Sequence, residues 1–253
     1  MANIEFDGLF NLRDVGGLPT LDGGRIQPGR LYRSGTPDGM TVPAARRAHS
    51  ELGIQTVIDL RHPDELLDAP SRGPLIAAHV TRHHISPVST ERSKAEQVEA
   101  LNLLLGVARE QQTPERYFIG LQSGGARYAE AAQLLTESTF PVLIHCTAGK
   151  DRTGILVGLL LEVAGVPPEE IGLDYEKSNA AIDRLIAHSQ EFGRNLDESR
   201  EELTARWQCP AERMAEFLGL VREEFGSGRG FFRAHGLSDA ELDTVRRRLV
   251  GSE

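Results

Sequence analysis

Hydrophobic and polar residues are arranged along this chain in two patterns, one typical of strands and one typical of helices. Thr56–Leu60 and Pro141–His145 are compact, apolar runs with the pattern of buried strands. His79–Ile85 is expected to form a third short strand. Arg25–Gln27 and Arg30–Tyr32 lie between turns rich in Gly and Pro, and we expect them to pair as a small hairpin.

Longer segments carry apolar residues at the spacing of a helix face. The predicted helices cover Pro43–Leu52, which ends at Gly53, residues 95–110, Arg127–Thr136, and Thr153–Ala164. Residues 169–225 are mostly helical by pattern, with a break at Cys209-Pro210. A loop is expected over Gly226–Gly230. Ser238–Val250 is expected to form a closing helix, in which Ser238 and Glu241 make a capping box.

Strands that alternate with helices favour an α/β fold with a central, mostly parallel sheet flanked by helices. The C-terminal half is mainly helical by pattern. The chain has 253 residues, and no composition shift or linker divides it. We therefore expect one domain over residues 1–253.

Composition and charge narrow the function classes. The net charge of −9 argues against broad nucleic-acid binding, which needs a basic surface. The longest apolar run, Ile155–Leu161, is too short to span a bilayer, and no secretory signal peptide is seen. The expectation is a cytoplasmic protein without integral membrane association, with secretion by another route left open, as is the oligomeric state. The two cysteines, Cys146 and Cys209, do not make a disulfide framework.

The segment from His145 to Gly154 joins a predicted strand to a predicted helix, and this junction is a natural anion site. Free amide groups of the loop and of the first helical turn point at one spot, where the helix dipole adds positive potential. Ala148 and Gly149 leave the backbone unobstructed, so the loop can curl round a phosphate. This placement predicts a phosphate cradle.

Cys146 enters that positive field at the end of the strand. A thiolate there is stabilised by the amides, by the dipole and by Arg152, and is a competent nucleophile toward phosphorus. The planar fork of Arg152 suits two phosphate oxygens. The hydroxyl of Thr153 is expected to donate to the sulfur when it leaves. The alternative interpretation is a buried structural cysteine followed by a glycine turn, which a lone cysteine would favour.

Cys146, Arg152 and Thr153 form the pattern Cys-x5-Arg-Thr, which resembles the signature of protein tyrosine phosphatases. More narrowly, the chain resembles the bacterial atypical tyrosine and lipid phosphatases. Supporting motifs recur in order along most of the chain, namely Asn11–Gly17, Leu31–Ser34, Asp59–Arg61, Asp174-Tyr175 and Ser178-Asn179.

The resemblance implies hydrolysis of phosphate monoesters through a phosphocysteine, with no metal or organic cofactor. Cys146 would be the nucleophile and Arg152 the phosphate binder. Expected substrates are phosphotyrosine, with phosphoserine, phosphothreonine or phosphoinositides as further classes, in a phosphorylated protein or lipid. The expected substrate-binding residues are Thr147, Ala148, Gly149, Lys150, Thr153, Gly154 and Asp14.

The general acid, which protonates the leaving group, is not found at the sequence position where the resembling family usually has it. There an Asp follows the Asp-Leu-Arg strand, whereas His84–Glu91 contains no Asp. Asp151, inside the loop, is the first candidate for the general acid, and orienting Arg152 or Lys150 is its alternative role. Glu91 is a weaker candidate, and Asp59 is expected to be structural.

Several further residues have two open interpretations. Lys150 suits a doubly phosphorylated headgroup or is a solvated lysine. Asn11 and Arg13 are expected to brace the loop, while Asp14 either braces it or lines the pocket. The cluster His79, His83 and His84 lacks a completing ligand at metal spacing, so we treat it as non-metal, and Cys209 as a structural thiol.

The stretch 180–215 places apolar residues between charged ones, which is typical of a packed helical face. The resemblance adds a movable helical lid over the site. Two rival functions come from other classes. One is a phosphate-binding interaction module without turnover, made plausible by the missing Asp. The other is a redox or sulfur-transfer enzyme, against which the pair Arg152-Thr153 argues.

Overall fold

A five-stranded sheet forms the centre of the fold. The computed structural model describes residues 5–67, 80–88, 93–106, 112–191, 193 and 195–250. The strands stand in the order β1-β2-β5-β3-β4. Only the pairing of β1 with β2 is antiparallel, and the other three pairings are parallel. The bounds are Arg13–Asp14 for β1, Leu31–Ser34 for β2, Thr56–Asp59 for β3, Thr81–His84 for β4 and Val142–His145 for β5.

The parallel strands end at one level, and this determines where the candidate chemistry lies. Ser34 and Asp59 both pair with His145, and Asp59 also pairs with His84. The segments that follow β2, β3 and β5 therefore leave the sheet at the same edge. In open α/β sheets this carboxyl edge is where ligands bind.

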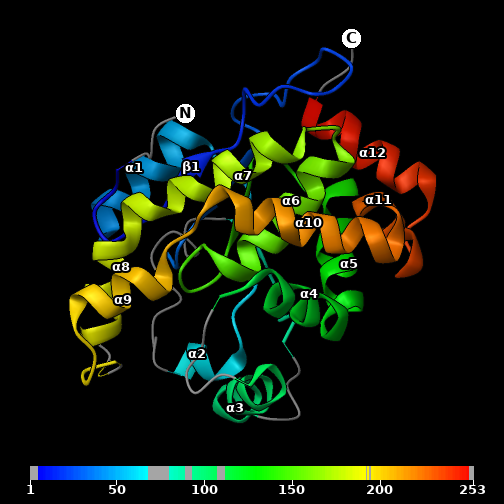
Figure 1. Cartoon of the computed structure of the whole chain (residues 1–253). Coiled ribbons are helices and arrows are strands. Elements are labelled where there is room, and N and C mark those ends of the chain that lie inside the picture. Colours follow the sequence, from blue (N-terminus) through cyan, green and yellow to red (C-terminus); the bar gives the residue numbers. More distant parts are fainter. Residues whose placement is uncertain are drawn as a thin grey trace.

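Helices account for most of the remaining chain (Figure 1). Their bounds are Val42–Leu52 for α1, Pro63–Leu67 for α2, Lys94–Leu105 for α3, Pro114–Ser123 for α4, Gly125–Gln133 for α5, Asp151–Val163 for α6, Pro168–Glu176 for α7, Ile182–Glu191 for α8, Arg200–Trp207 for α9, Ala211–Phe225 for α10, Gly228–Ala234 for α11 and Asp239–Val250 for α12. Short 3₁₀ turns cover Leu134–Thr136 and Lys177–Ala181. The predicted α/β architecture with a mostly parallel sheet and a helical C-terminal half is confirmed.

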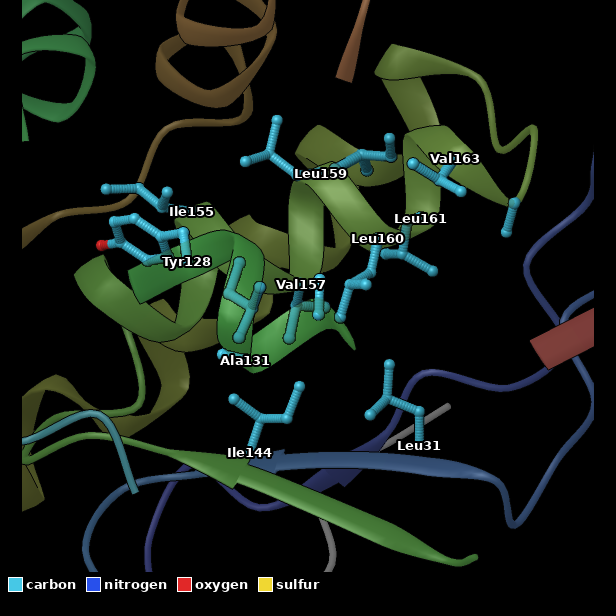
Figure 2. Close-up of a cluster of buried hydrophobic side chains, with 14 of the residues drawn as sticks. Leu31, Tyr128, Ala131, Ile144, Ile155, Val157, Leu159, Leu160, Leu161 and Val163 are labelled. Atoms are coloured by element: carbon cyan, nitrogen blue, oxygen red, sulfur yellow. The ribbon is translucent and has the colours of Figure 1, made fainter. Parts of the chain in front are cut away.

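The strands carry side chains alternately to two cores, as a strand buried on both faces must. Leu31, Ile58 and Ile144 face the larger core, which α5 and α6 cover (Figure 2). Val57 and Leu143 face the opposite core beneath α1. Helix α6 is apolar on nearly every side because it lies between the sheet and the C-terminal helices. Among the described residues, no helix has the length and apolarity needed to cross a membrane.

Several predicted helix ends are confirmed by their caps. Helix α1 ends at Gly53, which adopts a left-handed φ of 64°. At the start of α12, Ser238 Oγ accepts from the amide of Glu241 at 3.3 Å, and Glu241 Oε2 accepts from the amide of Ser238 at 2.8 Å. The predicted break at Cys209-Pro210 separates α9 from α10.

Other predictions of local structure were wrong. Arg25–Gln27 is not the hairpin partner of β2. Its segment folds back on residues 17–20 instead, where the amide of Ile26 donates to the carbonyl of Leu18 at 2.9 Å. Helix α4 was not predicted, and α11 occupies part of the expected loop because the hydroxyl of Ser227 caps it, accepting from the amide of Gly230 at 3.0 Å. The helix expected over 95–110 ends at Leu105, and residues 107–110 lie outside the described part.

A buried ion-pair cluster ties β1 and β2 to α7. The carboxylate of Asp174 lies 3.0 Å from Nε of Arg13 and 2.8 Å from Nη1 of Arg33. All three side chains are at most 1% exposed. Burial alone would raise the pKa of Asp174, but the two guanidinium groups outweigh it and hold that pKa well below its usual range. The cluster therefore depends on an ionised Asp174.

Replacing Asp174 by Asn should destabilise the fold strongly, because it leaves two buried guanidinium groups without their counter-charge. We expect the free energy of unfolding at pH 7 to fall by about 3–5 kcal/mol in urea titrations. Since the folded-state pKa of Asp174 is depressed, its stabilisation is complete above about pH 4 and is lost as the pH falls through the folded-state value. The difference between wild type and variant should therefore narrow in acid.

Asp183→Asn is the matched control, because Asp183 pairs with Arg200 on the surface, where the two side chains are 68% and 65% exposed. That change should leave the free energy of unfolding nearly unchanged. An Asp174→Asn protein as stable as Asp183→Asn at pH 7 would contradict the account of the cluster.

Candidate active site

Cys146 is the first residue after β5 and begins the loop that leads into α6. Its side chain is 1% exposed, and it lies at the carboxyl edge of the sheet between the ends of β2 and β3. The amide of Gly149 donates to the sulfur at 3.3 Å. The loop thus turns at least one backbone donor toward Cys146.

The carbonyl groups of the loop are held on its outer side by β1 and β2. The side-chain amide of Asn11 donates to the carbonyls of Ala148 and Gly149 at 3.0 and 3.1 Å. Arg33 Nη2 adds a bond to the Gly149 carbonyl at 3.1 Å. Because the C=O and N–H of one peptide unit point in opposite directions, the amides of Gly149 and Lys150 are turned the other way, toward the inside of the loop. The expected bracing role of Asn11 is seen directly.

Gly149 is required at this position by two local constraints. Its φ of +67° lies in the left-handed region, which disfavours a side chain. A Cβ at this residue would lie 2.1 Å from the carbonyl oxygen of Ser34. The loop can pack on the end of β2 only because this residue has no side chain.

Arg152 lies in the first turn of α6 and is held by Glu65, a residue that the sequence analysis missed. The two Glu65 oxygens accept from Nη1 and Nη2 of Arg152 at 2.5 and 2.9 Å. Nη1 also donates to the carbonyl of Leu60 at 3.1 Å. Burial alone would lower the pKa of Arg152, but Glu65 and Cys146 outweigh it and raise that pKa, so the guanidinium stays charged.

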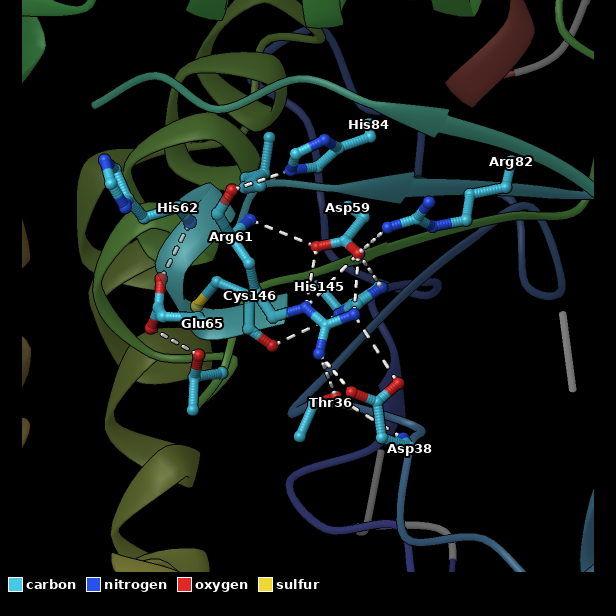
Figure 3. Close-up of polar contacts among 12 residues, drawn as sticks. Thr36, Asp38, Asp59, Arg61, His62, Glu65, Arg82, His84, His145 and Cys146 are labelled. Atoms are coloured by element: carbon cyan, nitrogen blue, oxygen red, sulfur yellow. Dashed lines mark hydrogen bonds and ion pairs between the residues drawn. The ribbon is translucent and has the colours of Figure 1, made fainter. Parts of the chain in front are cut away.

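Glu65 is itself fixed by the segment after β3 and by the loop after β5 (Figure 3). The amide of His62 donates to Oε2 at 2.8 Å, and the hydroxyl of Thr147 donates to Oε1 at 2.6 Å. The side chain is 5% exposed on the short helix α2. In the sequence it is one of two adjacent acids, Asp64 and Glu65, and only the folded chain shows that Glu65 faces Arg152.

Behind the loop, Asp59 has the structural role that was expected of it. Its carboxylate accepts from Nη2 of Arg61 at 2.8 Å and from Nη2 of Arg82 at 2.6 Å. Arg61 also forms an ion pair with Asp38, and the ring of His145 lies against the same cluster (Figure 3). These contacts hold the ends of β3, β4 and β5 together.

Asp151 and Lys150 form a second charged group at the other side of the loop. Lys150 Nζ lies 3.0 Å from Oδ1 of Asp151, and the hydroxyl of Tyr117 donates to the same oxygen. Lys150 is 3% exposed, so it is not a solvated lysine. Burial alone would raise the pKa of Asp151, but Lys150 and Tyr117 outweigh it and lower that pKa. Asp151 is therefore a carboxylate at neutral pH.

The remaining predicted site residues are not brought to the pocket. Asp14 faces the turns beside β1, where its two oxygens accept from the amides of Gly16 and Gly29 at 2.8 and 2.6 Å, so it is a brace. The hydroxyl of Thr153 is buried with no hydrogen-bond partner in the described part of the chain, so the expected bond to sulfur is not formed here. Gly154 packs α6 against Tyr175. Glu91 and His79 lie outside the described residues.

A pocket of about 1000 Å³ opens over the loop. It brings together the predicted residues Cys146, Thr147, Ala148, Lys150, Asp151 and Arg152. Leu185, His188 and Trp207 come from the predicted lid stretch and form one wall, whereas Val98, Leu101 and Leu104 of α3 form another that was not anticipated. Among the described residues, no cluster of His, Cys, Asp or Glu has the arrangement of a metal site.

This chain is similar in sequence to known phosphatases. Residues 4–251 match a family model described as the tyrosine phosphatase family. A triple specificity protein phosphatase, PtpB, of Mycobacterium tuberculosis is 29% identical to this chain, and the match covers 99% of the chain and 100% of that protein. A putative tyrosine-protein phosphatase of Cupriavidus necator is 34% identical over 70% of this chain and 63% of that protein.

Among solved structures, a putative phosphatase of Neisseria meningitidis is 25% identical to this chain. The match covers 69% of this chain and 91% of that one, with a TM-score of 0.28.

Proposed function

The chain belongs to the tyrosine phosphatase family, and we propose that it hydrolyses phosphate monoesters through a phosphocysteine formed on Cys146. One observation carries the proposal. In the loop after β5 the amide of Gly149 donates to the Cys146 sulfur, while the charged Arg152 lies in the same pocket. A phosphate cradle and a nucleophile therefore share one place. Residues 1–253 would form a single phosphatase domain, a proposal supported by the family match over 4–251.

Arg152 retains donors for a phosphate while it is bound to Glu65. Of its five N–H groups, three are used by Glu65 and the Leu60 carbonyl. In the described part of the chain, Nε and one N–H of Nη2 have no partner, and these two donors lie along one edge of the guanidinium. We propose that this edge binds two phosphate oxygens and the charge that grows on them in the transition state.

The proposed cycle has two displacements at phosphorus. In the first, the Cys146 thiolate attacks, the bond from phosphorus to the ester oxygen breaks, and that oxygen leaves with its electron pair. In the second, water attacks the phosphocysteine, the phosphorus–sulfur bond breaks, and inorganic phosphate is released. Arg152 and the loop amides stabilise both transition states, and Asp151 is the residue proposed for proton transfer. No metal or organic cofactor has a part in these steps.

Phosphotyrosine is the substrate class that the pocket favours. Its walls carry the apolar side chains of Val98, Leu101, Ile119 and Ile155 above the loop, and these suit an aryl ring. The full-length relative is named a triple specificity phosphatase, which extends the proposal to phosphoserine and phosphothreonine. Phosphoinositides are a further class, although Lys150, the residue expected to select them, is engaged by Asp151.

The first test is turnover of a chromogenic aryl phosphate and of a phosphotyrosine peptide. We expect both to be hydrolysed, and Cys146→Ser to reduce the rate by more than about 10³-fold because it removes the nucleophile. Cys209→Ser is the matched control, and it should retain turnover, since Cys209 does not line the pocket. Hydrolysis that survives in Cys146→Ser, or no hydrolysis by wild type, would contradict the proposal; the second result would favour a binding module without turnover.

The same assay with phosphoserine peptide and phosphoinositide vesicles tests the substrate class. The expected order places phosphotyrosine first by kcat/KM. A phosphoserine peptide or a phosphoinositide that exceeds phosphotyrosine would overturn the preference without affecting the role of Cys146.

Glu65→Gln should impair catalysis by leaving Arg152 mispositioned, because the amide removes the charge and one acceptor of the forked pair. A decrease in kcat/KM of about 10- to 100-fold is expected from misplacement of this kind. Glu51→Gln is the control, since Glu51 pairs with Arg47 on the exposed face of α1. Equal kcat/KM for the two variants would show that Glu65 is not needed to position Arg152.

A further inference from the structure

A directed row of hydrogen bonds ends on the carboxylate of Asp151. Nη1 of Arg213 donates to the hydroxyl of Tyr175 at 3.4 Å, and the two hydroxyls of Tyr175 and Tyr117 lie 2.6 Å apart. The hydroxyl of Tyr117 donates to Oδ1 of Asp151. Since the Tyr117 proton is committed to Asp151, Tyr175 must be the donor to Tyr117. Every hydrogen in the row therefore points toward Asp151, and each bond polarises the next.

The two oxygens of Asp151 differ in their surroundings. Oδ1 is occupied by Tyr117 and by Lys150, whose Nζ is 3.0 Å away. Oδ2 has no hydrogen-bond or ion-pair partner in the described part of the chain. The side chain is 29% exposed and lines the same pocket as Cys146. One oxygen is thus anchored to the protein while the other is available to a molecule in the pocket.

The groups that face Asp151 favour its charged form. Lys150 from the loop and Arg152 from α6 are cations, and Arg213 from α10 supports them through the row of hydroxyls. Tyr117 from α4 and Tyr175 from α7 keep their protons, because burial raises the pKa of each phenol above its usual value. Burial likewise raises the pKa of the nearby Cys209, which stays a neutral thiol. None of the groups named here carries a negative charge at neutral pH.

We propose that Asp151 is the general base of the second step, an assignment that rests on the proposed function. Tyr117 is the positioning residue, which holds the carboxylate of Asp151 for this role. The oxygen of a water molecule attacks phosphorus, and one water proton passes to Oδ2 of Asp151. The phosphorus–sulfur bond breaks, its electron pair returns to the sulfur of Cys146, and the amide of Gly149 donates a hydrogen bond to the thiolate that results. The proton then leaves Asp151 through the pocket.

This assignment differs from the sequence-based expectation that Asp151 protonates the leaving group. An ionised carboxylate has no proton to give in the first step. The leaving oxygen must then depart as a stable anion, which a phenol provides far better than an alkyl alcohol. The proposal accordingly ties the preference for phosphotyrosine to the charge state of Asp151 as well as to the pocket walls.

Pre-steady-state kinetics of Asp151→Asn with a chromogenic aryl phosphate separates the two steps. We expect a rapid burst of one phenol per protein molecule, followed by turnover about 10²- to 10⁴-fold slower than in wild type, because only the second step has lost its base. Without a burst, and with a loss of rate that grows as the leaving phenol becomes more basic, Asp151 would be a general acid and the proposal would be overturned. Unchanged turnover would overturn it too.

Tyr117→Phe tests the positioning role without altering Asp151 itself. Loss of the hydroxyl removes a donor to the carboxylate, so the pKa of Asp151 should rise, and the acid limb of the kcat profile should move to higher pH. A base is lost as the pH falls through its pKa, so a higher pKa means that activity declines earlier on acidification. Tyr32→Phe is the control, since Tyr32 belongs to the core beneath α1, and its profile should coincide with that of wild type.

An unmoved acid limb in Tyr117→Phe, in protein whose thermal unfolding matches that of Tyr32→Phe, would refute the positioning role. Turnover by Cys146→Ser distinguishes failure of the Asp151 assignment from failure of the proposed function. If Cys146→Ser abolishes turnover while Asp151→Asn shows no burst, only the assignment of Asp151 fails. If Cys146→Ser retains turnover, the proposed function fails first.

Discussion

The direction of two peptide units in the loop after β5 is the constraint on which the site depends. Asn11 and Arg33 hold the carbonyls of Ala148 and Gly149 on the outside, and the paired amides must then face the inside. Asp174 in turn keeps the Arg33 guanidinium in place. The segment that leads into β1 and strand β2 therefore shape the proposed anion site from the outer side of the loop, and the buried ion pairs around Asp174 serve the geometry of the loop as well as the stability of the fold.

The charged residues around the loop fall into two groups with different tasks. On one side, Glu65 fixes Arg152 so that one edge of the guanidinium remains available for an oxyanion. On the other side, Tyr117 and Lys150 fix one oxygen of Asp151 and leave the second available in the pocket. Arg152 and Asp151 are thus each held by partners that use only part of the hydrogen-bonding capacity of the side chain. Such preorganisation reduces the reorganisation needed when the charge moves during reaction.

The sequence predicted the parts of the molecule whose signals are local. The apolar runs of β3 and β5, the glycine that ends α1 and the loop motif at Cys146 each depend on neighbouring residues, and they are found where expected. The partners of the site are not local. Glu65 lies 87 positions from Arg152, and Tyr117 lies 34 positions from Asp151, so no spacing rule links them. Asp14 belongs to the same motif as Arg13, yet it points into a turn while Arg13 points to Asp174, because neighbouring strand residues face opposite sides.

The most direct test of the cradle is a crystal structure of the protein with orthovanadate, an oxyanion that can take the place of the phosphoryl group in transfer. We expect vanadium bonded to the sulfur of Cys146, with its oxygens held by the amides of Gly149 and Lys150 and by the Nε–Nη2 edge of Arg152. Glu65 should remain bound to the opposite edge of the same guanidinium. Vanadate held elsewhere in the pocket, with no bond to sulfur and with the loop amides turned away from it, would show that the loop is not a phosphate cradle.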